Sequence, residues 1–164
     1  MPSYFGPTNL PPIEAFKLGV PVFYPDLPGM REYVGNAAIL IDLNNPKSFV
    51  YTCNAGFIEN DHWIHDPNIG GGRLLGEACH FLDLLRFLAD SPIKDMDLIS
   101  SPNINHNPDN FVIQVQFNNG SIASINYFSN GTKLYPKERL EVFCSGTIHR
   151  LENFIQARKN NFAF

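Results

Sequence analysis

The feature that most constrains the fold is a pair of strand-like segments joined by a short polar turn. In FVIQVQF, residues 111–117, every second residue is a large apolar one, and SIASINYF, residues 121–128, returns after it. An apolar residue at every second position is typical of a strand with one buried face. Between them, Asn119-Gly120 predicts a type I′ turn, in which both central residues have a positive φ. The two segments therefore predict an antiparallel β-hairpin.

Four other segments extend this sheet or cover it. Strands are predicted at YTCNAGF (51–57), RLEVFCSG (139–146) and TIHRLENF (147–154), and one long helix over residues 73–88. A broad apolar stripe on the helix indicates that it lies on a face of the sheet. We therefore expect an α+β fold with an open, mixed or antiparallel sheet covered by one long helix. The stripe consists of Leu74, Leu75, Ala78, Leu82, Leu85 and Leu88.

The first 49 residues have a different pattern, in which helices and strands alternate. Pro11 and Pro12 suit the first turn of a helix IEAFKLG, and VPVFYP reads as a short buried strand. PGMREYVG then predicts a second short helix, and AAILID a second strand. Strand, helix and strand joined by short loops indicate a parallel β-α-β unit. The chain is thus expected to have two parts, residues 1–49 and residues 50–164.

Composition and charge exclude several classes of protein. Of the 164 residues, 44% are hydrophobic and 17% charged, which is typical of a globular protein. The formal net charge of −4 provides no basic field, so no nucleic-acid partner is expected. The apolar runs are too short to span a bilayer and the N-terminus lacks a secretory pattern, so no membrane association is expected. The three cysteines are odd in number and far apart, which indicates reduced thiols and a cytoplasmic location.

Residues 3–48 resemble the end of the donor-binding half of group 1 (family 4) retaining glycosyltransferases. The resemblance rests on SYFGPTNLPPIEAFKLGVPVFYPDLPGMREYVGNAAILIDLNNPKSF. It implies a small fragment of a Rossmann-like half, in which Glu14 matches the glutamate that binds the ribose of a nucleotide-sugar. A helix N-terminus suits phosphate binding because it carries partial positive charge and N–H donors. Without the resemblance, Glu14 is simply a first-turn carboxylate that suits the helix dipole.

Residues 51–156 resemble the C-terminal domain of the Gfo/Idh/MocA oxidoreductases, the group of glucose-fructose oxidoreductase and inositol dehydrogenase. The matching stretches are NAGFIENDHWIHDPNIGGGRLLGEACHFLDLLRFL, FNNGSIASINYFSNG and PKERLEVFCSG. In complete enzymes of this group an N-terminal Rossmann domain holds NAD(P), and the C-terminal sheet carries the substrate pocket. The resemblance implies that residues 50–164 are such a domain, truncated at its end, with a role in substrate binding or oligomerisation.

The same resemblance assigns site residues on and before the predicted helix. His80 falls at the position of the catalytic histidine, which exchanges a proton with the sugar hydroxyl that is oxidised, and imidazoles titrate near neutral pH. The family commonly has an aspartate four residues earlier, where this sequence has Gly76, and Glu77 is its candidate substitute. Gly71 and Gly72 permit close approach of the backbone to a sugar. Other candidate substrate-binding residues are Asp61, His62, Trp63 and His65.

Structural alternatives exist for several of these residues. His62 and His65 either line the pocket or cap a loop, and Trp63 is either a stacking platform for a sugar or a lid on the sheet. Asp83 either orients the ring of His80 or pairs with an arginine at the surface. Histidine, cysteine and acidic residues gather here, but no pair has the spacing of a zinc signature such as H-E-x-x-H, so no metal site is predicted.

The cofactor-binding parts of both families are missing from the sequence. No G-x-G-x-x-G fingerprint follows a strand, and the E-K-P stretch that supplies the catalytic lysine of the oxidoreductases is absent. No cofactor is therefore expected on this chain. Three functions remain. The first is a sugar or nucleotide-sugar oxidoreductase module, completed by a separate NAD(P)-binding chain or assembled as a homo-oligomer through its sheet. The second is a non-catalytic fusion remnant or sugar-binding module, and the third is a fragment of a glycosyltransferase.

Overall fold

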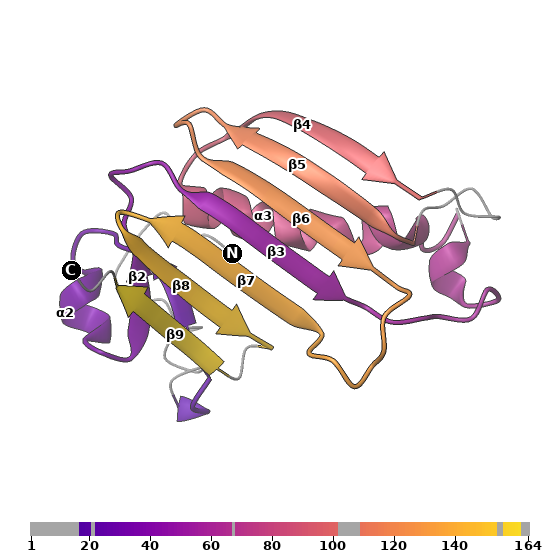
Figure 1. Ribbon diagram of the computed structural model, residues 1–164, viewed down its shortest axis with the longest axis horizontal. Coiled ribbons are helices and arrows are strands. Elements are labelled where there is room, and N and C mark those ends of the chain that lie inside the picture. Colours follow the sequence, from indigo (N-terminus) through magenta and orange to yellow (C-terminus); the bar gives the residue numbers. More distant parts are fainter. Residues whose placement is uncertain (1–16, 21, 67, 102–108, 154–155, 162–164) are drawn as a thin grey trace.

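A seven-stranded sheet forms the body of the molecule, and a two-stranded sheet lies beside it (Figure 1). The computed structural model describes residues 17–20, 22–66, 68–101, 109–153 and 156–161. In the large sheet, β3 runs parallel to β6 and antiparallel to β7, and the other neighbours are antiparallel, which confirms the expected mixed sheet. Its strands, in spatial order, are β4 (Ile93–Ser100), β5 (Phe111–Phe117), β6 (Ile122–Phe128), β3 (Ser48–Asn54), β7 (Glu138–Cys144), β8 (Thr147–Glu152) and β9 (Gln156–Asn161).

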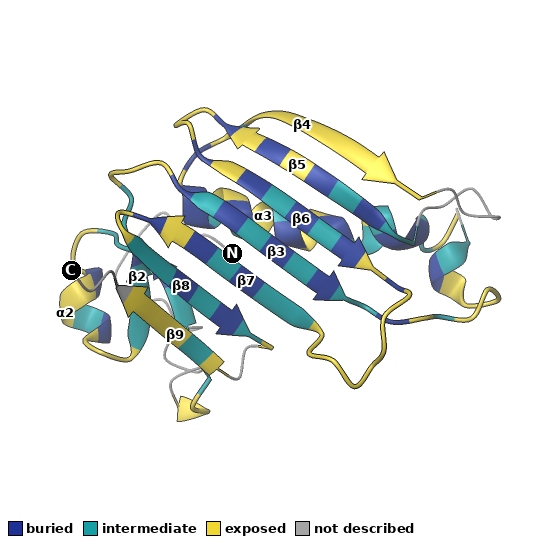
Figure 2. Cartoon of the chain, in the orientation of Figure 1, coloured by how far each residue is buried: buried dark blue, intermediate teal, exposed yellow. Residues whose placement is uncertain are grey.

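One face of the large sheet, the inner face, carries helix α3 (Cys79–Ala89), which lies behind the strands in Figure 1. Alternate residues of the central strands point to this face and are buried, as the colour alternation in Figure 2 shows. In β3 these residues are Phe49, Tyr51 and Cys53, each at most 2% exposed. The opposite face, the open face, carries the exposed and partly buried residues of the same strands.

The expected long helix over residues 73–88 is not one continuous α-helix: a π-helical segment, η2 (Leu74–Ala78), runs directly into the shorter α3. A π turn holds more residues than an α turn and so shifts the phase of an apolar stripe. The prediction that Leu75 faces the sheet is therefore wrong, because its side chain is 71% exposed. Phe81 is buried instead, together with Leu85 and Leu88, against the inner face.

The hairpin β5–β6 is confirmed, but its turn differs from the predicted type I′ turn. Gly120 has a φ of +86°, whereas Asn119 is not among the residues with positive φ. The N–H of Gly120 donates to the carbonyl of Phe117 at 3.1 Å, and the N–H of Phe117 donates to the carbonyl of Ser121 at 2.9 Å. This geometry matches the longer hairpin loop, in which a turn is followed by one residue in the left-handed conformation.

The two edge strands of the large sheet were not predicted. Along β4 (IKDMDLIS) every residue after Ile93 is exposed, so the strand has no buried face to impose a period of two on its sequence (Figure 2). The other edge strand, β9 (QARKNN), is polar and mostly exposed. Pairing with one neighbour, β5 or β8, holds each of them in the sheet.

The predicted β-α-β unit is present and docks on the large sheet. Strands β1 (Val22–Pro25) and β2 (Ala38–Ile41) are parallel and are joined through helix α2 (Met30–Val34). Phe23 and Ile39 pack against the main core, and the ring of Tyr24 lies 5.5 Å from that of Phe87 in α3. Two parallel strands bury too little surface to be stable alone, so this contact stabilises the unit. The helix predicted from Pro11 and Pro12, with Glu14, lies almost entirely outside the described residues.

A buried histidine lies at the junction between the two sheets. His149 in β8 is 3% exposed, and its ring meets the ring of Phe23 edge-on at 6.2 Å. Its Nε2 lies 3.0 Å from the Thr147 hydroxyl, while its Nδ1 is buried without a hydrogen-bond partner among the described residues. Burial, and then the charge of Lys159 directly opposite in β9, lower the pKa of His149 below the ordinary value of 6.5.

This lowered pKa predicts an acid-sensitive junction. The folded chain favours the neutral ring, so the stability that it contributes is present above about pH 6.5 and is lost as the pH falls toward the lower folded-state pKa. We expect the urea midpoint of the wild type to fall between about pH 7.5 and about pH 5.5, and that of His149→Gln to fall less. Equal decreases in the two proteins would contradict the assignment. Asp42, whose pKa is held far below its usual value chiefly by its hydrogen bond from Asn45, titrates well below this window.

Candidate functional site

A hollow of about 490 Å³ lies between the N-terminal half of the helix and the inner face of the sheet. Residues of three elements line it. From η2 and α3 come Glu77 and His80, with Gly76, Phe81 and Leu84 beside them. Tyr51 comes from β3, Glu138 is the first residue of β7, and Lys137 directly precedes it. The hollow thus combines two carboxylates, an ammonium group, an imidazole and a phenol with an apolar wall.

Tyr51 joins the apolar wall to the polar wall of the hollow. Its ring stacks on that of Phe81, with 4.5 Å between the centroids. Its hydroxyl donates a short hydrogen bond to Oε2 of Glu138. Burial and this bond raise the pKa of Tyr51 well above its usual value, so the phenol stays protonated and remains a donor.

The backbone fixes the positions of Lys137 and Glu138. The carbonyl of Lys137 accepts from the N–H of Asn54 at 2.7 Å, and the N–H of Glu138 donates to Oδ1 of Asn153 at 3.0 Å. The Lys137 Nζ lies 3.7 Å from Oε1 of Glu138, and the Lys137 side chain is 58% exposed. Each oxygen of Glu138 therefore has its own partner, one a phenol and the other an ammonium group.

Glu77 is held from behind by a buried arginine. Arg73 is 2% exposed, and its Nε lies 3.5 Å from Oε1 of Glu77. The guanidinium also donates to the carbonyl of Gly56 at 2.8 Å and lies 5.2 Å from the ring centre of Tyr127. Since a buried charge needs partners, this network fixes the guanidinium and, through it, the carboxylate of Glu77.

His80 and Glu77 are the two sequence-predicted residues that the structure brings together in the hollow. His80 is exposed, and the solvent-facing side of the helix also carries Asp83, whose Oδ1 pairs with Nη2 of Arg86 at 3.3 Å. This pair confirms the surface interpretation of Asp83. Cys79 is exposed, whereas burial raises the pKa of the Cys53 thiol to about 12.

The predicted loop residues lie outside the lining of this hollow. His62 caps the short helix η1 (Trp63–His65), since its Nδ1 accepts from the N–H of Ile64 at 3.2 Å, which confirms the loop-capping interpretation. The Nδ1 of His65 lies 3.8 Å from Oδ1 of Asp109, just before β5. Trp63 is 57% exposed, and Asp61 is also exposed. Their role in substrate binding stays a prediction.

The glycine run makes the turn into the helix. Gly71 and Gly72 have φ values of +67° and +84°, which side chains rarely adopt. A Cβ on Gly70 would lie 2.5 Å from the backbone of Ile64, so only glycine permits this close approach. The run thus packs the loop against the start of the helix. It does not contribute to the lining of the hollow, and contact with a sugar stays a prediction.

Sequence reasoning missed Tyr51, Lys137 and Glu138 as site residues. Tyr51 alternates with Phe49 and Cys53, so it reads only as a core residue of a strand. Lys137 and Glu138 read as the polar start of a strand. These two residues reach the hollow through the pairing of β7 with β3, which are antiparallel neighbours. This pairing places Glu138 opposite Cys53 on the inner face. Sequence alone does not provide that pairing.

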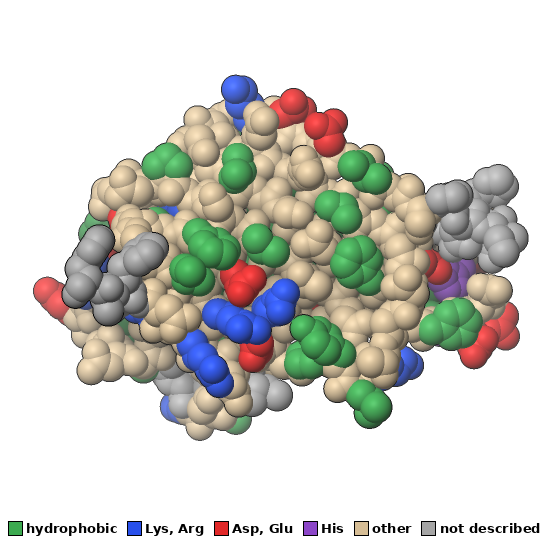
Figure 3. All heavy atoms as spheres, viewed as in Figure 1, with side chains coloured by type: hydrophobic (Ala, Val, Ile, Leu, Met, Phe, Trp, Pro, Cys, Tyr) green, Lys and Arg blue, Asp and Glu red, His purple; other side chains and the backbone are tan. Residues whose placement is uncertain are grey.

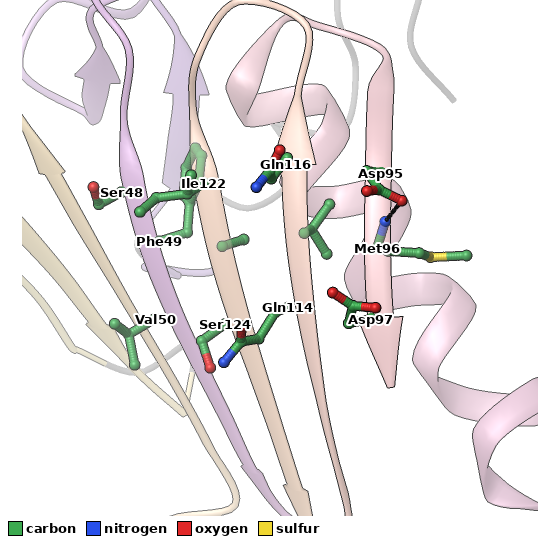
Figure 4. Close-up of a pocket in the computed structure, with 12 residues that line it drawn as sticks. Ser48, Phe49, Val50, Asp95, Met96, Asp97, Gln114, Gln116, Ile122 and Ser124 are labelled. Carbon is green, nitrogen blue, oxygen red and sulfur yellow. Dashed lines mark hydrogen bonds between the residues drawn. The ribbon is translucent and has the colours of Figure 1, made fainter. Parts of the chain in front are cut away.

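A second hollow, of about 420 Å³, lies on the open face over β3 to β6 (Figure 4). It is lined by amide, hydroxyl and carboxylate groups, among them Gln114, Gln116 and Ser124, and by Ile122. It contains no histidine, lysine or tyrosine, and so offers fewer acid/base groups than the inner hollow. Among the described residues, no group of three or more histidine, cysteine, aspartate or glutamate side chains is arranged to hold a metal ion.

The centre of the open face carries charges of alternating sign, surrounded by apolar side chains (Figure 3). Glu141 lies 3.9 Å from Nε of Arg139 and 3.8 Å from Nε of Arg150, and Arg150 also pairs with Glu152. The exposed apolar side chains on the same face include Ile122, Phe128 and Phe143, which are 52%, 38% and 39% exposed.

Sequence comparison identifies the family of the chain. Residues 43–148 match the family described as GFO/IDH/MocA C-terminal domain. The chain belongs to this family. The match covers the first five strands of the large sheet in chain order, the helix and both hollows, and it ends at the start of β8. No curated protein matches the chain in sequence.

Solved structures of oxidoreductases share the fold. An NAD-binding protein from Listeria innocua is 25% identical, with a TM-score of 0.56 over 68% of this chain and 33% of that chain. The aldose-aldose oxidoreductase from Caulobacter crescentus, complexed with glycerol, is 16% identical, with a TM-score of 0.60 over 91% and 41%. The WlbA dehydrogenase from Bordetella pertussis, in complex with NADH and UDP-GlcNAcA, is 16% identical, with a TM-score of 0.55 over 67% and 34%.

The chain therefore spans about a third to two fifths of the length of these relatives. These matches show that the chain has the same fold as the corresponding part of those structures. Within the described ranges, no helix combines the length and the apolar character needed to cross a bilayer.

Proposed function

We propose that the chain is the sugar-binding half of a Gfo/Idh/MocA-type oxidoreductase and that the inner hollow is its substrate site. The observation that carries this proposal is that His80 and Glu77, on the helix, open into the same hollow as Lys137 and Glu138. His80 would exchange a proton with a ligand hydroxyl, the general acid/base role that suits an imidazole. Solved structures with this fold include the WlbA dehydrogenase in complex with UDP-GlcNAcA and a levoglucosan dehydrogenase in complex with L-sorbose, which supports this class of ligand.

The lining of the hollow suits a polyhydroxylated ligand. Carboxylates accept hydrogen bonds from ligand hydroxyls, an ammonium group donates to them, and an imidazole does either. Phe81 and Leu84 provide apolar surface for the C–H face of a sugar ring. A few polar groups at fixed positions around an apolar wall are the usual composition of a small-molecule site.

The described residues do not fit a nicotinamide cofactor. After β1 the chain continues Asp26-Leu27-Pro28-Gly29 into a helix of five residues, which lacks the glycine-rich turn and the long helix of a dinucleotide fold. We therefore assign no redox step to this chain. Oxidation of the bound sugar would depend on an NAD(P)-binding domain beyond the described residues.

The part before residue 49 has a supporting role in this proposal. We infer that residues 3–48 derive from a glycosyltransferase donor half, because β1, α2 and β2 keep the parallel β-α-β arrangement of such a half. In this chain the unit covers the inner face beside α3. A non-catalytic sugar-binding module, with the same hollow and no partner chain, is the alternative function.

We also propose that a second copy of the chain covers the open face. Arg139 and Glu141 of β7 lie opposite Glu152 and Arg150 of β8, and this square of alternating charges can pair with the same square of a second copy about a twofold axis. The exposed apolar side chains around it, Phe143 among them, would be buried in that contact.

Titration of the ¹⁵N-labelled full chain with glucose tests the substrate site. We expect saturable shifts of the amide signals of Glu77, His80 and Lys137 in the millimolar range. His80→Ala should weaken binding about tenfold through loss of its hydrogen bonds, and change the free energy of unfolding by less than about 0.5 kcal/mol because the ring is exposed. Asp83→Asn, three residues along the helix, is the matched control and should bind like the wild type. Shifts confined to other parts of the chain would refute the site.

Sedimentation equilibrium tests the open-face contact. We expect the wild type to be a dimer at roughly 50 μM and Phe143→Asp to be a monomer at that concentration, because the substitution places two unpaired charges in the contact. Phe57→Asp changes an exposed loop phenylalanine away from the sheet and should leave the dimer intact. A monomeric wild type, or a dimer that survives Phe143→Asp, would contradict the assignment.

A further inference from the structure

We infer that Glu138 makes the inner hollow selective for uncharged polyols over sugar acids. This inference rests on the proposed function. The hollow faces the ligand with two carboxylates, those of Glu77 and Glu138, and with a single ammonium group, that of Lys137. Arg73, which pairs with Glu77, is buried at the N-terminal end of η2 and is absent from the lining. The groups that meet a ligand therefore carry more negative than positive charge when His80 is neutral.

The one ammonium group is already engaged by a carboxylate. Lys137 Nζ lies 3.7 Å from Oε1 of Glu138. An anionic ligand must therefore compete with the Glu138 carboxylate for the ammonium group, and the same carboxylate repels it. Glu138 is fixed in place by Tyr51 and by its backbone N–H, which donates to Asn153. Its side chain is 19% exposed, so less water screens its charge than that of a surface glutamate.

An uncharged polyol meets no such penalty. Its hydroxyls can donate to the carboxylate oxygens and accept from Lys137 without displacing one charge from the other. Glucose and glucuronate form a matched pair of probes, because they share the ring and differ only in the group at C6, a hydroxymethyl in one and a carboxylate in the other. The ratio of their dissociation constants therefore reports the charge preference of the hollow.

Two substitutions in the hollow should move this ratio in opposite directions. Glu138→Gln removes the negative charge, keeps an acceptor for Tyr51 and releases Lys137, so binding of glucuronate relative to glucose should rise about tenfold. Lys137→Gln removes the cation and should lower the relative binding of glucuronate by a similar factor. Glu59→Gln changes an exposed glutamate outside the hollow and is the control, which should leave the ratio unchanged.

The measurement is an NMR titration of each full-length variant with glucose and with glucuronate at about pH 7, followed at the amide signals of the hollow. A wild type that prefers glucose, with the two opposite changes, supports the inference. A wild type that binds glucuronate as tightly as glucose, or a ratio that Glu138→Gln leaves unchanged, overturns the inference while the sugar site stands. Binding of neither sugar to any of the proteins overturns the proposed function and the charge preference with it.

Discussion

Tyr51 is the residue on which the geometry of the candidate site depends most. Its ring stacks on Phe81 of the helix, and its hydroxyl donates to Glu138 at the start of β7. It therefore fixes the helix and β7 relative to the central strand between them. Because its pKa is raised by burial and by Glu138, the hydroxyl stays a donor over the whole physiological range. The hollow is thus held open by contacts within the protein and does not require a ligand to form.

The second constraint is the burial of the inner face. The helix covers the strands from β5 to β3, while the β-α-β unit reaches β8 through the contact of Phe23 with His149. The two parts of the chain therefore share one core. An isolated unit of two parallel strands buries too little apolar surface to be stable in water, which explains why it docks on the large sheet.

Most of the fold could be predicted from the sequence because burial imposes a period on it. The hairpin around Gly120, the strands β3, β7 and β8, and the β-α-β unit all have the apolar alternation or runs that a buried face requires. β4 could not be predicted, because a strand exposed on both faces has no such period. The π turn before Cys79 could not be predicted either, since an apolar period does not distinguish it from an α turn.

The part of the candidate site that is local in sequence could be predicted, and the part that depends on strand pairing could not. His80 and Glu77 are near each other in sequence and share a motif, so resemblance to the family finds them. Lys137 and Glu138 lie about sixty residues further along, and they reach the hollow only through the register of β7 against β3. Gly76, where the family commonly has an aspartate, lines the same hollow. The carboxylates of Glu77 and Glu138 are therefore the acidic groups available at this site.

The central claim is that the inner hollow, and not the second hollow on the open face, is where this chain binds a sugar. A co-crystal structure of the full chain with glucose tests it most directly. The account predicts glucose between His80 and Glu138, with its hydroxyls within hydrogen-bond distance of the imidazole and the carboxylate. Glucose bound instead on the open face, beside Gln114 and Gln116, would contradict it.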